Sequence, residues 1–382
     1  MADAFQNILG QPDARNLLRA SVVSDRVTHA YLFVGPAGSN KTQAAYALAA
    51  AIVCPKGAKG PRGGACGDCE NCRKVGKRTH PDIHYHAPEG ASGYLIGQIR
   101  EIVSDISLAP IQASRKVYII DRADLLGHSA SNALLKTLEE PPDDVVLILM
   151  ARTRDSILPT IASRCQIIPF RHIPPSEAAG IISQNTGADA ESSRIALEAA
   201  NGSITNAIAF LAPSNNDRPM IRTELLRGLC RISGMDEWDI LKLAKWTVDA
   251  YSGKNGPAGM LRDELEQRLA EEQEFLSKSA IKRIEERNRR RLSKETTALL
   301  FEALAIISSW LRDIAVAAGG APELIINSDF RDKIESDSVG ASLPGISMAL
   351  ASVDEARSAL DYNVSPETCF DNVFFKIKEA FE

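Results

Sequence analysis

The first residues that could do chemistry form a candidate phosphate-binding loop. A short apolar stretch and an alanine-rich stretch flank the loop sequence Gly35-Pro36-Ala37-Gly38-Ser39-Asn40-Lys41-Thr42. Backbone N–H groups at a helix N-terminus hold phosphate oxygens, and the helix dipole adds to this attraction. Lys41 is placed to reach the outer phosphates of ATP, and Thr42 to bind Mg²⁺. The loop, with Gly35 and Gly38 at its turns, therefore predicts a nucleotide site between a strand and a helix.

Asn40 departs from the usual loop, which has a glycine before the lysine. That glycine permits a left-handed backbone, and asparagine tolerates this conformation better than most residues. Two outcomes stay open here. The loop either still binds nucleotide, or it has decayed and keeps only the fold.

A second acidic motif follows the apolar residues 117–120. Asp121 is expected to serve a nucleotide-bound Mg²⁺. The next position, where an ATPase of this type has its general base, is Arg122, and a guanidinium cannot accept a proton. Asp124 would have to be redirected to replace it, and the alternative is that Arg122 is only a surface residue. Either way, ATP hydrolysis by this chain itself is expected to be weak or absent.

Four cysteines are spaced to bind one metal ion. The spacing C-x11-C-x2-C-x2-C is made by Cys54, Cys66, Cys69 and Cys72. Four thiolates complete a tetrahedral Zn²⁺ site without an open position, which makes such a site structural. The Gly-, Lys- and Pro-rich segment within the cluster cannot bury a core, so it needs a metal to fold. The alternatives are a ligand exchange with His80, His84 or His86, a group of reduced thiols, or an iron–sulfur site.

The composition excludes several classes of protein. Seven cysteines, an odd number, and an N-terminus unlike a signal peptide argue against a disulfide framework and predict a cytoplasmic protein. No run approaches the roughly 20 apolar residues that span a bilayer, so no membrane contact is expected. The net charge of −5 excludes a chain-wide basic surface for nucleic acid.

Strands and helices alternate through the first 170 residues or so. Strands are predicted at 31–34, 117–120, 145–150 and 167–170, and helices at 42–52 and 129–140. This alternation predicts a parallel sheet that is covered on both faces. Beyond the Ile-Pro-Pro sequence at 173 the patterns are helical only. We therefore predict an α/β core at 1–172, a small helical domain at 173–213 and, after a polar linker at 212–217, an all-α domain at 218–382.

Several segments together resemble the clamp-loader branch of the AAA+ ATPases. Besides the loop and the cysteine insert, they are His29–Phe33, Asn132–Pro142 and Leu158–Cys165. The resemblance covers about the first 210 residues and implies an AAA+ P-loop core with a zinc module at about 54–72, a helical lid and a C-terminal oligomerisation collar. It also implies a function in DNA replication within DNA polymerase III. There such subunits form a hetero-pentamer of gamma/tau, delta and delta-prime subunits that loads the sliding clamp onto primed DNA.

The resemblance also assigns functions to single residues. Arg164 matches an arginine finger that acts on the ATP of a neighbouring subunit, a function that a guanidinium suits because charge develops on the transferring phosphoryl group. The alternative is a structural arginine at the sheet edge. Thr153 matches a sensor position that orients water. Thr205 stands where active members of the family have a lid arginine.

Three positions distinguish the two kinds of clamp-loader subunit that this chain resembles. A gamma/tau-like motor subunit is expected to have a glycine at position 40, a glutamate at 122 and an arginine at 205, and this chain has none of them. The resemblance is therefore greater to the delta-prime family, whose members assist the motor. The alternative is a gamma/tau-like ATPase that tolerates these substitutions and hydrolyses ATP itself.

A basic stretch at 278–291 raises a third possibility. It has seven basic and two acidic residues, and a basic helix can lie along phosphates or an acidic membrane. The acidic stretch at 263–274 could neutralise it, and a solvated helix face is the simpler interpretation. No aromatic residue interleaves with the basic ones, so stacking on single strands is not expected. The negative net charge also disfavours a stand-alone DNA-binding module. The amphipathic stretch at 300–316, which includes Trp310, is predicted to pack in the collar.

Overall fold

The computed structural model describes residues 4–57, 64–88, 93–200, 202–212, 217–272, 278–362 and 364–382. The chain divides into two compact units, 1–181 and 182–382, and the boundary along the sequence falls within helix α7 (Pro175–Thr186). The predicted linker at 212–217 lies mostly outside the described residues. The three-part division of the chain stays a prediction.

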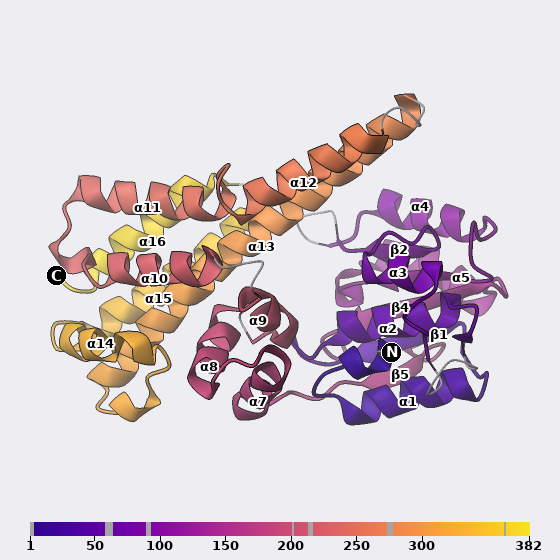
Figure 1. Ribbon diagram of the computed structural model, residues 1–382, viewed down its shortest axis with the longest axis horizontal. Helices are drawn as coiled ribbons and strands as arrows, with labels where there is room; N and C mark the ends of the chain where they lie inside the picture. The colour runs from indigo at the N-terminus through magenta and orange to yellow at the C-terminus, as the bar shows by residue number, and fades with distance from the viewer. Residues whose placement is uncertain are drawn as a thin grey trace. The chain divides into compact units, whose positions relative to one another are not determined.

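The first unit is built on a parallel sheet (Figure 1). Its strands are β1 (Ala30–Val34), β2 (Ile83–His86), β3 (Lys116–Ile120), β4 (Val145–Ala151) and β5 (Gln166–Pro169), in the spatial order β2-β3-β4-β1-β5. The parallel α/β core is therefore confirmed, with four strands at the predicted places. The edge strand β2 is not predicted by the sequence patterns, because its half-buried side chains include two histidines and form no apolar run.

Helices cover both faces of the sheet. They are α1 (Pro12–Val23), α2 (Lys41–Val53), α3 (Glu70–Gly76), α4 (Ile96–Ile106), α5 (His128–Glu139) and the single turn α6 (Pro159–Ala162), with 3-10 turns at Ala4–Asn7 and Ala123–Leu125. On β1, Tyr31 and Phe33 face the apolar layer that contains α1 and α2, whereas Ala30 and Leu32 face the layer of α4 and α5. Burial on both faces explains why the central strands read as continuous apolar runs.

The second unit is helical throughout its described residues. Its helices are α8 (Ala190–Ala199), α9 (Ile204–Phe210), α10 (Asp217–Leu229), α11 (Glu237–Ser252), α12 (Pro257–Glu272), α13 (Lys278–Ala318), α14 (Arg331–Ser338), α15 (Leu343–Asp361) and α16 (Pro366–Glu379), with 3-10 turns at Ile232–Gly234, Pro322–Leu324 and Ser328–Phe330. Trp310 of α13 is fully buried and packs on Phe381, with ring centroids 5.8 Å apart. The predicted all-α C-terminal region is confirmed.

The basic stretch at 278–291 begins α13, and residues 263–272 of the acidic stretch lie on α12. Figure 1 shows α12 and α13 side by side, and they contact each other. Mutual neutralisation of the two stretches stays a prediction. None of the described helices is both long and apolar enough to cross a membrane.

A buried carboxylate fixes the loop between α4 and β3. Asp82, just before β2, has no exposed surface. Its oxygens accept hydrogen bonds from three successive backbone N–H groups, those of Ile111 (2.6 Å), Gln112 (2.8 Å) and Ala113 (2.7 Å). Burial favours the neutral carboxyl group, but these donors outweigh it and hold the pKa of Asp82 below its usual value.

We expect Asp82→Asn to lower the free energy of unfolding by about 3 kcal/mol at neutral pH, because hydrogen bonds to a charged group contribute about 1.5–3 kcal/mol each. Since folding lowers the pKa of Asp82, its contribution is complete above about pH 4, the pKa of an unfolded aspartate, and is lost as the pH falls further. Urea unfolding at pH 7 and at pH 3 measures both effects.

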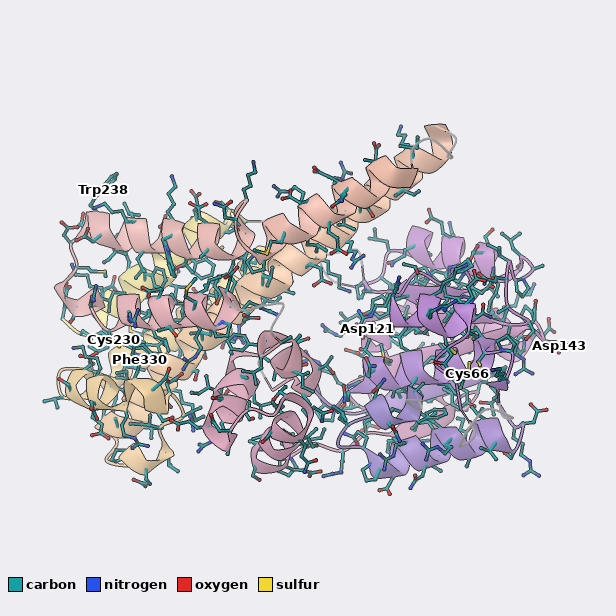
Figure 2. All side chains as sticks on the ribbon, viewed as in Figure 1. Cys66, Asp121, Asp143, Cys230, Trp238 and Phe330 are labelled. Carbon is teal, nitrogen blue, oxygen red and sulfur yellow. The ribbon has the colours of Figure 1, made fainter. Side chains whose placement is uncertain are left out.

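The matched control is Asp143→Asn, because Asp143 is exposed at the surface of the first unit (Figure 2). This change should alter the free energy of unfolding by less than about 0.5 kcal/mol. Equal losses in the two variants, or a loss at Asp82 that does not shrink in acid, would contradict the role of the three N–H donors.

Candidate nucleotide and metal sites

The phosphate-binding loop joins β1 to α2 at the carboxyl edge of the sheet. Gly35 passes so close to β5 that a Cβ there would lie 2.4 Å from the carbonyl oxygen of Phe170. Gly38 and Asn40 both have left-handed backbones, with φ of +75° and +69°. Asn40 thus adopts the conformation expected of the glycine it replaces, and its side-chain amide donates to the carbonyl of Leu9 at 3.3 Å. The loop is therefore formed despite the substitution.

Lys41 begins α2 and folds back over the loop. Its Nζ donates to the carbonyl oxygens of Gly35 and Pro36, both at 2.6 Å, and to Oγ of Ser39 at 3.2 Å. These partners are loop groups that a bound phosphate would have to displace. The Lys41 ammonium group therefore lies against the loop, where the oxygens of a bound phosphate would replace its carbonyl partners.

The charges around Lys41 link the loop to two neighbouring strand ends. Burial lowers the pKa of Lys41 to about 8, the carboxylates of Asp121 and Asp124 oppose this change, and Arg152 adds to it. Asp121 follows β3 and Arg152 follows β4, so three adjacent strand ends meet at the loop, where α/β sheets bind ligands. The sequence patterns do not identify Arg152 as a residue of this site, although it directly precedes Thr153, the predicted sensor residue.

Thr153 lies on the exposed loop after β4. Its carbonyl oxygen accepts a hydrogen bond from Oγ of Ser156 at 2.7 Å. The structure thus places Thr153 at the same edge of the sheet as the phosphate-binding loop. Its function in orienting water stays a prediction.

Arg122, at the usual place of the general base, turns toward Asp124. Its backbone is left-handed, with φ of 50°, and its Nε lies 3.6 Å from Oδ2 of Asp124. The Arg122 and Asp124 side chains are 43% and 10% exposed, so this ion pair is partly open to water. Arg122 itself cannot act as the general base, because a guanidinium does not accept a proton. The candidate substitute base, Asp124, faces this guanidinium.

Both oxygens of the Asp121 carboxylate are engaged by the protein. The hydroxyl of Tyr85 donates to Oδ2 at 2.5 Å, and the N–H of Arg122 donates to Oδ1 at 2.9 Å. Tyr85 was not singled out by its sequence. On β2 it faces the apolar layer that contains α2, on the side of the sheet opposite to His84 and His86. Because the sequence patterns do not predict this strand, they carry no signal for Tyr85.

Arg164 follows the short helix α6 and is partly exposed. Its guanidinium pairs with Glu139, at the end of α5, at 2.6 Å and donates to the carbonyl of Thr160 at 2.8 Å. The two paired side chains are 36% and 48% exposed. Because exposed ion pairs contribute about 1 kcal/mol or less, Arg164 can leave Glu139 at small cost.

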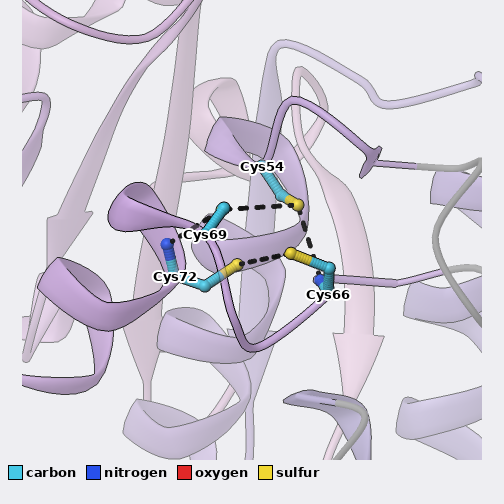
Figure 3. Close-up of side chains that lie close together, drawn as sticks. All are labelled: Cys54, Cys66, Cys69 and Cys72. Atoms are coloured by element: carbon cyan, nitrogen blue, oxygen red, sulfur yellow. Dashed lines mark hydrogen bonds between the residues drawn. The ribbon is translucent and has the colours of Figure 1, made fainter. Parts of the chain in front are cut away.

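The four cysteines meet where α2 ends and α3 begins (Figure 3). Their sulfur atoms all lie within 4.8 Å of one another, with Cys54 and Cys69 4.0 Å apart and Cys66 and Cys72 3.9 Å apart. A tetrahedral zinc ion with Zn–S distances of about 2.3 Å requires sulfurs about 3.8 Å apart. The cluster therefore fits a tetrahedral ion. Within the part of the chain that the structure describes, no histidine joins this cluster, so the alternative with a histidine ligand is not supported.

Backbone donors support the cysteine ligands. The N–H of Cys66 points at Sγ of Cys54, and the N–H of Cys72 at Sγ of Cys69, both at 3.4 Å. Hydrogen bonds from N–H groups favour the thiolate, which is the form that binds metal. The backbone of the segment is therefore arranged for charged sulfur atoms.

The cysteine cluster is tied to the rest of the first unit through Asn71 of α3. Its amide nitrogen donates to the carbonyl of Val53 in α2 at 2.7 Å, and its amide oxygen accepts from the side chain of Gln112 at 2.9 Å. Lys74 also donates to Gln112, at 2.8 Å. These polar contacts join residues far apart in the sequence, and no local pattern marks them.

Residues 10–174 match the protein family described as DNA polymerase III, delta subunit. The chain is similar to DNA polymerase III subunit delta' of Bacillus subtilis (strain 168), with 38% identity over 165 residues, which cover 43% of this chain and 49% of that protein. It is also similar to DNA polymerase III subunit gamma/tau of Mycobacterium tuberculosis (strain ATCC 25618 / H37Rv), with 34% identity over 172 residues, 45% of this chain and 29% of that one.

Among solved structures, a DNA polymerase III gamma subunit-related protein from Thermotoga maritima aligns with a TM-score of 0.46 and 17% identity, over 97% of this chain and 99% of that one. The chain spans about half the length of the curated delta' relative and less of the gamma/tau relative. The resemblance predicted from the motifs is confirmed over residues 10–174. Both kinds of relative match, and the delta' relatives, at 38% and 40% identity, support the predicted resemblance to the delta-prime family.

Proposed function

Because its first unit is related to the delta-prime family of DNA polymerase III, we propose that this chain is a clamp-loader subunit that completes the ATP site of a neighbouring subunit. Its partners in this proposal are gamma/tau and delta subunits in a hetero-pentamer. The sliding clamp and primed DNA are the substrates of the whole assembly. The chain itself contributes structure and one catalytic side chain.

The observation that carries this proposal is the arrangement of charges after β3. Arg122 stands where a motor subunit would have its general base, and it pairs with Asp124. A motor subunit needs a carboxylate that is free to accept a proton from the attacking water. The guanidinium of Arg122 at this position cannot accept that proton and therefore supports a subunit that does not hydrolyse its own ATP.

Arg164 supplies the catalytic contribution in this proposal. A guanidinium directed at a transferring phosphoryl group stabilises the charge that develops in the transition state. In the free chain Arg164 follows the short helix α6, and its guanidinium contacts the partly exposed Glu139, the carbonyl oxygen of Thr160 and, at 3.4 Å, Oγ of Ser163. These contacts are weak enough to be exchanged for a phosphate of the neighbouring subunit.

We further propose that the cysteine cluster holds a structural Zn²⁺. Its donor set is four sulfur atoms without a place for water or substrate, and this combination suits zinc. When bound, the ion would join the end of α2 to the start of α3. It takes no part in the chemistry of ATP.

The first test is ATP turnover by the isolated chain. We expect phosphate release at least about 10²-fold below that of a gamma/tau subunit, with or without primed DNA, because a general base typically contributes about 10²–10⁴-fold. Lys41→Ala serves as the control: turnover that this change leaves intact comes from a contaminant. Turnover equal to that of a motor subunit, and abolished by Lys41→Ala, would instead support the gamma/tau-like alternative.

A further inference from the structure

Tyr85 reaches the nucleotide site from the edge strand β2. Its hydroxyl donates to Oδ2 of Asp121 at 2.5 Å, while Oδ1 accepts the N–H of Arg122 at 2.9 Å. In a phosphate-loop site this carboxylate normally takes part in holding Mg²⁺ together with the loop threonine. Here both oxygens of the Asp121 carboxylate already accept hydrogen bonds from the protein.

The ring of Tyr85 is fixed by its packing against α2. It stacks on Tyr46, with ring centroids 6.2 Å apart and planes 18° from parallel, and the guanidinium of Arg78 lies 4.8 Å from the centre of the Tyr46 ring. Tyr46 lies one helical turn beyond Thr42 on α2, which packs against β3. The phenol of Tyr85 is thus held against the carboxylate of Asp121, the residue expected to serve a metal ion.

Tyr85 is the donor in its contact with Asp121, because an ionised carboxylate only accepts hydrogen bonds and a phenol keeps its proton at neutral pH. The neutral phenol can only donate a hydrogen bond to the carboxylate, and it keeps its proton. It therefore lowers the capacity of Asp121 to attract a cation.

We propose that Tyr85 excludes Mg²⁺ from this site, so that the loop binds the phosphates of a nucleotide without a divalent ion. Lys41 and the N–H groups at the start of α2 supply the positive field instead. The inference rests on the proposed function of residues 35–42 as a phosphate-binding loop. It does not depend on Arg164, which acts on the nucleotide of another subunit.

The test is calorimetric titration of the full chain with ADP and with ATP, once in excess EDTA and once in excess Mg²⁺. The wild-type protein should bind with the same affinity, within about twofold, in both conditions. Tyr85→Phe keeps the stacked ring and frees Oδ2 of Asp121. This variant should bind at least about tenfold more tightly with Mg²⁺ than without it, the equivalent of one charge-assisted hydrogen bond.

Tyr94→Phe is the matched control. The hydroxyl of Tyr94 contacts the main-chain carbonyl oxygens of His86 (2.8 Å) and Asp121 (2.6 Å), and its removal leaves the Asp121 carboxylate engaged. This variant should bind nucleotide equally well with and without Mg²⁺. Electron paramagnetic resonance with Mn²⁺ as the probe gives a second measurement, since nucleotide-dependent Mn²⁺ binding should be seen only in Tyr85→Phe.

Three results would overturn the proposal. They are wild-type binding that requires Mg²⁺, Tyr85→Phe binding that is indifferent to it, and no nucleotide binding by any variant in either condition. The last result would leave the function of Arg164 intact, so the two proposals fail separately. Circular dichroism of each variant establishes that the fold is retained.

Discussion

Loss of the metal from the four-cysteine cluster is expected to lower the free energy of unfolding of the first unit by about 5 kcal/mol. Structural zinc ions in small modules contribute about 10–16 kcal/mol of apparent binding free energy. Only part of this would be lost here, because the sheet keeps its two apolar layers. Four thiolates brought within 4.8 Å of one another without an ion repel each other or must take up protons.

The measurement compares the zinc content and thermal unfolding of the wild-type chain and Cys69→Ser. Cys69 both contributes a sulfur to the cluster and begins α3, where it accepts the N–H of Cys72. Zinc should fall from about one ion per chain to well below that in the variant. Cys165→Ser is the matched control, since Cys165 lies outside the cluster and should leave the zinc content unchanged.

A second consequence of metal loss is expected in the loop before β3. The side chain of Gln112 is held by Asn71 and Lys74 of α3, so disorder of α3 would remove these contacts. Backbone amides of residues 107–109 should then exchange hydrogen faster, whereas the N–H groups held by Asp82 should stay protected. A wild-type protein that carries no zinc and unfolds at the same temperature as Cys69→Ser would contradict the zinc assignment.

The central strands could be predicted because burial on both faces makes each of them an uninterrupted apolar run. The edge strand β2 could not, since its side chains are only half buried and its pattern Ile-His-Tyr-His has no apolar run. Helix α4 was open to prediction: Ile99, Ile102 and Ile106 repeat at the helical period and lie in the core.

The loop and the cysteine cluster are local in sequence, and so their residue types and spacing suffice to find them. The partners of these residues are distant in sequence. Tyr85 is 36 residues from Asp121, and their contact depends on the pairing of β2 with β3. Glu139 meets Arg164 only because α5 and α6 pack together. A single sequence contains no record of such register and packing, so the restraint on Asp121 and the pairing of Arg164 came from the structure.

Replacement of Arg164 is expected to have the second large effect, on the assembled clamp loader. We expect Arg164→Ala to slow ATP hydrolysis at the neighbouring site by about 10³-fold, the lower end of what arginine fingers contribute. Assembly should be unchanged, because the side chain is partly exposed and its removal breaks only exposed contacts, those with Glu139, the carbonyl oxygen of Thr160 and Oγ of Ser163. Arg164→Lys should recover little, since an ammonium group lacks the planar fork of a guanidinium.

Two further variants separate catalysis by Arg164 from a structural function. Glu139→Ala breaks the same ion pair but leaves the guanidinium in place, so hydrolysis by the complex should stay close to that of the wild type. Arg227→Ala removes another exposed arginine that is paired with a glutamate, Glu224, and should also have little effect. The measurement is single-turnover ATP hydrolysis by the reconstituted complex with clamp and primed DNA, together with size-exclusion analysis of its assembly. If Glu139→Ala slows hydrolysis as much as Arg164→Ala does, the ion pair itself is what matters and Arg164 is a structural arginine.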